Sequence, residues 1–194
     1  DYFFERERWR AAAECYKNAG NADGEEKARG FVLEQEGNHA AAGRLFEKHD
    51  YPVRAAASYE RAGEPERALP LWERLGEPER ARRCRASVHE ARGEYEDAAA
   101  ELEKLGDLEG ALRCWERAGN HLQVARRHLA AKRYQEAALS FEKAGAVEEA
   151  CRCYKKLKKP ARAAELCFRS GRYAESAALY KKLKNTDMLV RCWE

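Results

Sequence analysis

The stretch GEYEDAAAELEKLG, residues 93–106, decides the fold, because its pattern returns every thirteen residues. We count places from the first residue of each unit, so Ala98 and Leu102 stand at the third and seventh places after Tyr95. Later units keep a small or apolar residue at the third place and a mostly aromatic one at the seventh. The unit starts are Tyr95, Leu108, His121, Tyr134, Val147, Pro160, Tyr173 and Thr186. This fixed period indicates an array of similar units.

Each unit has the apolar spacing of an amphipathic helix. In the unit that begins at Tyr134, the residues Ala137, Ala138 and Phe141 share one helix face. Gly145 follows at the eleventh place, where several other units also carry glycine. Glycine ends a helix readily because it takes up left-handed backbone without a Cβ clash. The pattern therefore predicts helices of about three turns.

The same register extends toward the N-terminus. It gives six further starts, at or near Trp9, Glu25, His39, Pro52, Pro65 and Pro78. We therefore predict an all-α fold, a right-handed α-solenoid of about fourteen short antiparallel helices in about seven helical hairpins of 26 residues. The composition agrees, because 37% of the residues are charged and helix-forming types dominate. No strands are expected.

Three irregularities interrupt the register. Residues 21–24, Asn-Ala-Asp-Gly, predict a longer loop between two helices. After Pro78, the apolar stripe continues for one extra turn before Gly93, which predicts a longer helix there. Pro70 falls inside a predicted helix and removes a backbone hydrogen bond, so we expect a local kink.

Residues 93–106 and the similar stretch KRYQEAALSFEKAG, residues 132–145, resemble the second helix of tetratricopeptide-like (TPR-like) repeats. The resemblance covers nearly the whole chain but departs in period, since the family's hairpin has about 34 residues. Shorter hairpins are similar to those of clathrin-type and intraflagellar-transport solenoids, and of repeat tails in some large helicases and bacterial defence proteins. The resemblance implies a scaffold for protein interactions, and no binding residue is transferred from the family.

The chain reads as one TPR-like α-solenoid over residues 1–194, and we expect it to be a segment of a longer chain. Phe3 occupies the aromatic place of a preceding unit, and residues 191–193 fall in a last helix without a stop signal. Seven cysteines mostly recur at two places of the unit, which predicts free thiols in the core. No long apolar run is present. We expect a soluble protein of a reducing, cytoplasmic compartment, without membrane contact.

Catalytic and metal-binding patterns are absent from the sequence. His39, His121 and His128 occupy places on the apolar stripe, which predicts packed side chains rather than ligands. Cys151 and Cys153 face different sides of a helix. We expect a non-enzymatic chain with no catalytic residue, no metal, no cofactor and no small-molecule substrate.

Two units break the common surface pattern. Most units carry Glu after the seventh place, but the units with Tyr154 and Tyr180 carry Lys there. From residue 146 onward, the chain has twelve Lys and Arg and six Asp and Glu, which gives a net charge of +6. Because the whole chain has a net charge of +3, the preceding residues have a net charge of −3. The candidate basic edge, expected to lie on one side of the array, consists of Lys155, Lys156, Lys158, Lys159, Lys181, Lys182 and Lys184.

Two interpretations of the basic edge stay open. Lysines in the last turn of a helix stabilise it through the helix dipole and need no ligand. Alternatively, they bind an acidic protein surface or a nucleic-acid backbone through its phosphates. A second basic run, residues 80–85, spreads around its helix and is weaker evidence. The sequence thus favours a protein-interaction scaffold, with a nucleic-acid-binding or sensor arm of a helicase, nuclease or defence protein as the alternative. A purely structural spacer is the third possibility.

Overall fold

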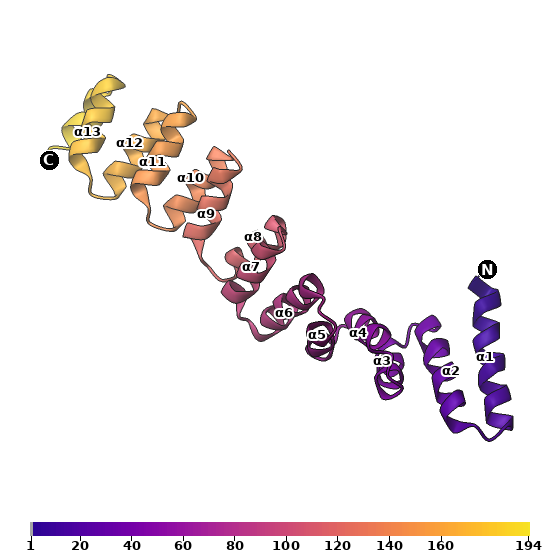
Figure 1. Cartoon of the computed structure of the whole chain (residues 1–194). Coiled ribbons are helices and arrows are strands. Elements are labelled where there is room, and N and C mark those ends of the chain that lie inside the picture. The colour runs from indigo at the N-terminus through magenta and orange to yellow at the C-terminus, as the bar shows by residue number, and fades with distance from the viewer. Residues whose placement is uncertain (1) are drawn as a thin grey trace. The chain divides into compact units, whose positions relative to one another are not determined.

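The computed structural model describes the backbone of residues 2–194 and the side chains of residues 8–194. Fourteen helices and no strands form this described part of the chain (Figure 1). The helices are α1 (Tyr2–Asn18), α2 (Ala22–Gln35), α3 (His39–Lys48), α4 (Pro52–Arg61), α5 (Pro65–Arg74), α6 (Pro78–Arg92), α7 (Tyr95–Lys104), α8 (Leu108–Arg117), α9 (His121–Ala130), α10 (Tyr134–Lys143), α11 (Val147–Lys156), α12 (Pro160–Arg169), α13 (Tyr173–Lys182) and α14 (Thr186–Arg191). From α3 onward, every helix begins at the predicted residue.

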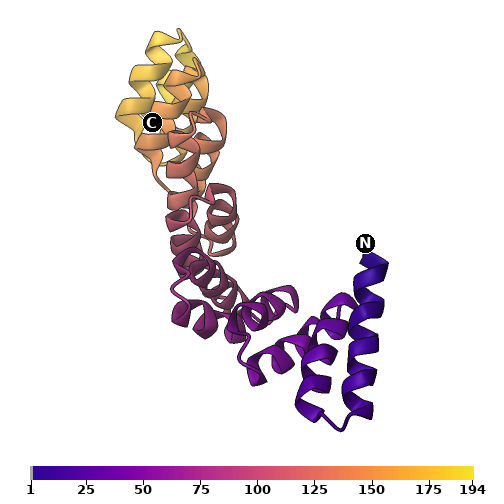
Figure 2. The ribbon, with the colours of Figure 1, turned by 45° about the vertical axis from the view of Figure 1, so that its right-hand side comes forward.

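The chain divides into two compact units, Asp1–Ala111 and Leu112–Glu194, and α8 crosses the division. Within each unit, the main contacts join helices that are neighbours in sequence. In the first unit, α1 and α2 lie side by side and run in opposite directions in two views (Figures 1 and 2). The all-α repeat architecture is confirmed, whereas its handedness stays a prediction.

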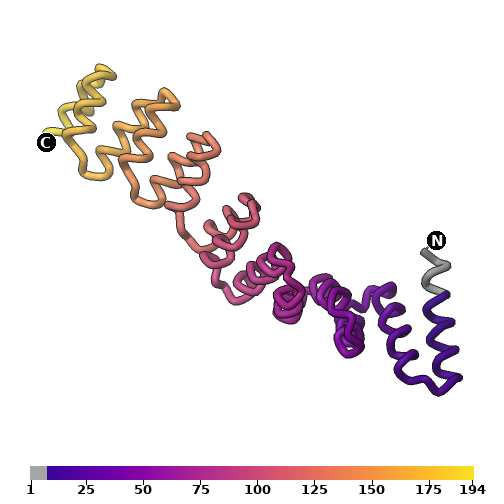
Figure 3. Tube along the Cα trace, in the orientation of Figure 1, coloured from indigo at the N-terminus to yellow at the C-terminus, as the bar shows by residue number. Residues whose placement is uncertain are grey.

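Short connections join each helix to the next, as the trace in Figure 3 shows. A residue with positive φ follows every helix from α1 to α13, and nine of these thirteen residues are glycine. At one such connection, Gly145 has φ 72°, and the N–H of Ala146 donates to the carbonyl oxygen of Phe141 at 2.9 Å. This six-residue bond belongs to the Schellman motif, which satisfies the last carbonyl groups of a helix. Short, repeated connections therefore set the thirteen-residue period.

Lys158 and Lys184 take the place of this glycine in two connections, with φ values of 56° and 57°. Left-handed backbone costs a residue with a Cβ about 1–2 kcal/mol, and glycine avoids most of that strain. We expect Lys158→Gly to raise the free energy of unfolding by about 0.5–1 kcal/mol, measured by urea denaturation. Ala178→Gly, at an exposed position in the middle of α13, should instead lower it by about 0.5–1 kcal/mol. Destabilisation by both changes would contradict the backbone assignment.

Small and aromatic residues form the core at the predicted places. Ala137 and Ala138 have no exposed surface, and the Phe141 side chain of the same helix is 2% exposed. In the first unit, Tyr59 and Trp72 occupy the equivalent seventh places and are also buried. The small residues let neighbouring helices approach, and the aromatic side chains fill the space between them. The predicted register is confirmed.

The N-terminal irregularity is a longer helix, so the predicted long loop at residues 21–24 is wrong. Helix α2 begins at Ala22, and the side chain of Asn21 accepts a hydrogen bond from the Gly24 N–H at 2.9 Å. An Asn cap at this position turns the polar stretch into the first turn of a helix. Helix α1 likewise begins at Tyr2, earlier than the predicted start near Trp9, so one helix contains both Phe3 and Trp9. The side chain of Phe3 lies outside the described residues.

The other irregularities have different outcomes. Helix α6 has 15 residues and continues to Arg92, as the extra turn of its apolar stripe predicted. Helix α5 runs through Pro70, so the proline does not end the helix, and a kink there stays a prediction. Helix α14 ends at Arg191, so the prediction that it includes residues 192 and 193 is wrong.

The cysteines are free, and six of the seven are buried. Cys15 is the exception, because its side chain is exposed on α1 and does not belong to the core. A buried thiol is shielded from reagents, whereas an exposed one reacts through its thiolate. We expect iodoacetamide at pH 8 to alkylate one thiol of the folded chain quickly, as counted by mass spectrometry. Cys15→Ser should remove that fast reaction, and rapid labelling of several thiols would contradict the packing.

Two buried thiols make the fold sensitive to alkali. Burial raises the pKa of Cys84 and of Cys151 to about 12, with further contributions from Glu60 and Cys167 respectively. The cysteine thiol of an unfolded chain has a pKa of about 8.5. Between about pH 9 and 12 the unfolded chain therefore releases thiol protons that the folded chain retains. We expect the melting temperature to fall as pH rises through this window. In the double variant Cys84→Ala and Cys151→Ala, the melting temperature measured by calorimetry should fall less steeply with pH. An unchanged slope of melting temperature against pH would show that these thiols do not cause the decline.

Candidate functional site

All seven lysines of the basic edge are exposed. Lys156 places its ammonium 5.4 Å from the centre of the Tyr134 ring, and Lys159 donates a hydrogen bond to Gln135 at 2.8 Å. These contacts direct two of the lysines onto the preceding helix α10. Within the described residues, the side chains of the other five form no hydrogen bond or ion pair. The structure therefore leaves most of these cations open to solvent, and their place on a single edge stays a prediction.

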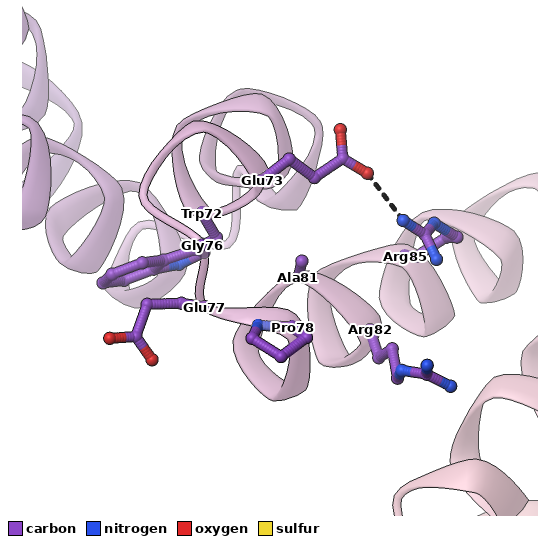
Figure 4. A pocket seen from close by; sticks show the side chains of 8 residues that line it. All are labelled: Trp72, Glu73, Gly76, Glu77, Pro78, Ala81, Arg82 and Arg85. Atoms are coloured by element: carbon purple, nitrogen blue, oxygen red, sulfur yellow. Dashed lines mark hydrogen bonds and ion pairs between the residues drawn. The ribbon is translucent and has the colours of Figure 1, made fainter.

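A hollow between α5 and α6 lies in the first unit (Figure 4). Gly76, with φ 70°, ends α5, and Pro78 begins α6 two residues later. This tight turn brings the end of one helix beside the first turns of the next. The hollow has a volume of about 370 Å³, within the range of about 300–1,000 Å³ that is typical of ligand pockets. We call it the α5–α6 hollow, lined by Trp72, Glu73, Gly76, Glu77, Pro78, Ala81, Arg82 and Arg85.

Trp72 belongs both to the hollow and to the core. Its side chain is 1% exposed, and its ring lies 4.5 Å from the guanidinium carbon of Arg80. Among the described residues, the buried indole Nε1–H of Trp72 has no hydrogen-bond acceptor. A buried donor without an acceptor costs about 1–3 kcal/mol, so such groups are rare in folded proteins. The indole N–H of Trp72 is therefore an unusual group in this core.

The two arginines of the hollow differ in their partners. Arg85 donates to Glu73 at 2.6 Å, and its second terminal nitrogen lies 3.6 Å from Glu101. Burial alone would raise the pKa of Glu101, but Lys104, Arg85 and Arg82 outweigh it and hold that pKa below its usual value. The Arg82 side chain forms no hydrogen bond or ion pair within the described part of the chain, although its charge acts on Glu101. The two arginines of the hollow thus share Glu101 as an electrostatic partner, and only Arg85 is held by a close ion pair.

Glu77 does not supply the missing partner for Arg82. Figure 4 shows its carboxylate on the other side of Pro78 from the Arg82 guanidinium. Glu73 reaches toward Arg85 instead, along the ion pair drawn in the same view. The Glu77 side chain forms no hydrogen bond or ion pair within the described residues, so its carboxylate is an acceptor that the hollow still offers.

A row of arginines accompanies the aromatic core of this unit. Each stands at the second place of its helix and lies over the aromatic ring at the seventh place of the preceding helix. The distances from guanidinium carbon to ring centre are 5.9 Å for Arg54 and Phe46, 5.4 Å for Arg67 and Tyr59, and 4.5 Å for Arg80 and Trp72. Contacts of this geometry are favourable cation–π interactions. They hold three cations at successive helix junctions.

Two further hollows lie in the first unit. One, of about 540 Å³, contains Arg83 and the Cys84 thiol, which donates to Glu60 at 3.4 Å. The other, of about 380 Å³, is lined partly by Trp9 and Phe31, whose rings stack with centres 4.1 Å apart. Glu34 at that hollow already pairs with two arginines. Arginine side chains line all three hollows, and aromatic side chains line two of them.

One group of side chains has the spacing of metal ligands. His89, Glu94 and Asp97 present ligand atoms within 4.8 Å of one another around the end of α6. The two carboxylates are exposed, and His89 Nδ1 lies at hydrogen-bond distance, 2.6 Å, from Glu94, so a surface hydrogen bond accounts for the approach of these two residues.

The histidines on the predicted stripe are partly buried. His39, His121 and His128 all have intermediate exposure, which agrees with packed side chains. The sequence pattern did not single out His49. Among the described histidines that pair with carboxylates, His49 is the most buried, with 6% of its side chain exposed. Its two ring nitrogens face Asp23 at 3.0 Å and Glu26 at 2.9 Å. This contact joins α3 to α2 and serves packing.

The sequence pattern placed the candidate site in the second unit and missed the α5–α6 hollow. The run of arginines at residues 80–85 was visible, but their spread around α6 weakened the signal. The repeated second-place arginines, thirteen residues apart, were the clearer sign. What the sequence could not show is the buried indole N–H, since that depends on which acceptors pack around Trp72.

Comparisons with protein-family models and with curated proteins add no information on the function of the chain. No protein-family model matches the chain, and no curated protein matches it significantly. Among the described helices, none is both long enough and apolar enough to cross a membrane.

Proposed function

We propose that the chain is a non-enzymatic scaffold or recognition module for protein–protein interactions, acting in the cytoplasm as a TPR-like part of a larger protein. The observation that carries the proposal is the set of three hollows in the first unit, all lined by arginine and two of them also by aromatic side chains. These residue types are enriched where proteins bind one another. Repeated helix pairs present such surfaces on a rigid support.

A peptide selection tests this proposal. The whole chain, immobilised and folded, is exposed to a displayed library of random twelve-residue peptides, and bound peptides are sequenced. We expect enrichment of related peptides that also bind the free chain in calorimetry. Failure to enrich any peptide, together with turnover of a small substrate, would contradict the proposed class.

A second candidate function is binding of nucleic acid by the basic edge. The exposure of the lysines favours it, because all seven are exposed and the side chains of five of them form no hydrogen bond or ion pair within the described residues. Here the lysines would contact phosphates rather than bases.

Salt dependence tests this second function. Binding of a fluorescent single-stranded oligonucleotide should weaken steeply as salt rises, with a slope that counts the phosphates engaged. The double variant Lys155→Glu and Lys181→Glu should reduce affinity and slope, whereas Arg74→Glu with Arg83→Glu, in the first unit, serves as the control of equal charge change. An equal loss of affinity in both double variants would mean that the oligonucleotide binds through general electrostatic attraction and not at the basic edge.

A further inference from the structure

We propose that the second unit binds a nucleic-acid duplex through its phosphate backbones, across three connections at one end of its helices. The inference rests on the second candidate function. It adds the form of the nucleic acid and a third connection, which the basic edge does not include. The three connections join α9 to α10, α11 to α12, and α13 to α14, and we call them the basic connections.

The basic connections lie at the same end of the second unit. Successive helices from α9 to α14 pack on one another in chain order and reverse direction at each short connection. Figures 1 and 3 show these three connections at one end of the helices, with the α10–α11 and α12–α13 connections at the other. Packed helices lie about 8–10 Å apart, so neighbouring basic connections are separated by at most about 20 Å. A duplex of about 12 base pairs, about 40 Å long, can therefore reach all three.

Positive charge in the second unit is concentrated at this end. We compare equal stretches, each with the second half of a helix, its connection and the start of the next helix. The stretches with the basic connections, residues 126–136, 152–162 and 178–188, contain thirteen Lys and Arg and two Asp and Glu. The stretches at the opposite end, residues 139–149 and 165–175, contain three Lys and Arg and five Asp and Glu. The helix dipole does not explain this difference, because helices finish at both ends of the unit.

The cations of the basic connections are accessible to a ligand. Twelve of the thirteen are exposed. At the α9–α10 connection, the side chains of Lys132 and Arg133 form no hydrogen bond or ion pair within the described residues. Arg152 and Arg162 pair with exposed glutamates of their own helices, and surface pairs of this kind are weak. A polyanion therefore meets solvated positive charges without first breaking a strong buried pair.

The aromatic residues of the basic connections favour a duplex over a single strand. Proteins that bind single strands stack the bases on aromatic rings. Here Tyr154 and Tyr180 are buried, and the Lys156 ammonium lies over the half-buried Tyr134 ring. A duplex keeps its bases stacked inside and presents one negative charge per about 1.7 Å of its axis, twice the density of one strand. The phosphates of a duplex therefore match these exposed cations better than a single strand does.

Competition binding on the whole chain tests the form of the ligand. Fluorescence anisotropy follows a labelled sixteen-base-pair DNA duplex, and the competitors are the unlabelled duplex, one of its strands and polyglutamate. We expect the duplex to compete at a concentration at least about fivefold lower than the single strand, because of its higher charge density. Equal competition by the single strand or by polyglutamate would overturn the inference. If the chain binds the single strand as tightly as the duplex, the second candidate function survives; binding of neither contradicts that function as well.

Two double charge reversals locate the contact. Lys132→Glu with Arg133→Glu should weaken duplex binding by about tenfold or more, and the salt slope should become less steep by about 2, since two phosphate contacts are lost. Lys143→Glu with Arg169→Glu makes the same change of charge at exposed residues of the opposite end and should have a much smaller effect. Equal weakening by both double variants would overturn the inference. If reversal at Lys155 and Lys181 weakens binding but reversal at Lys132 and Arg133 does not, the second candidate function survives and this inference fails.

Discussion

Trp72→Ala is expected to lower the free energy of unfolding by about 3–5 kcal/mol, the largest loss among the single changes considered. The Trp72 side chain is 1% exposed and lies at the seventh place of α5, between two helices of the first unit. Its removal leaves a cavity and also ends the cation–π contact with Arg80. Urea unfolding followed by circular dichroism measures the loss.

Trp193→Ala is the matched control for this prediction. Trp193 also occupies a seventh place, but its side chain is 72% exposed, so its removal should change stability by less than about 0.5 kcal/mol. A similar effect of both substitutions would mean that burial at Trp72 does not contribute to the fold as described.

The second large effect is overpacking at a small residue. Ala150 has no exposed surface and stands at the third place of α11, inside the core cluster of the second unit. Ala150→Leu should lower the free energy of unfolding by about 1–3 kcal/mol, because the added methyl groups force α11 away from its neighbours. Ala137→Leu in α10 should do the same, since Ala137 is equally buried.

Ala161→Leu provides the control for overpacking. Ala161 is exposed on α12, so the larger side chain meets solvent rather than a neighbouring helix. Its effect on thermal unfolding should stay within about 0.5 kcal/mol. An Ala150→Leu chain as stable as the Ala161→Leu chain would contradict the assigned register.

Much of the fold could be predicted from the sequence, because it depends on local signals repeated many times. Pro52, Pro65 and Pro78 begin helices where the missing N–H is not needed, and glycine ends most of them. The predicted loop at residues 21–24 was wrong because asparagine is common both in loops and at the start of helices. In the structure, Asn21 caps α2, and the residues after it are helical.

The candidate site was less predictable for a physical reason. The lysines of the basic edge are visible as charge in the sequence, and their exposure follows from their places on the helices. The α5–α6 hollow instead depends on pairs that form between helices, such as Arg85 with Glu73. Only the structure shows which arginine of α6 forms a close ion pair with a carboxylate of another helix. Sequence distance carries no information on that choice.

The most direct measurement is a crystal structure of the chain bound to its tightest selected peptide. We predict that the peptide lies in one of the three hollows of the first unit and contacts an arginine that lines it. A peptide bound elsewhere, with all three hollows empty, would contradict the account.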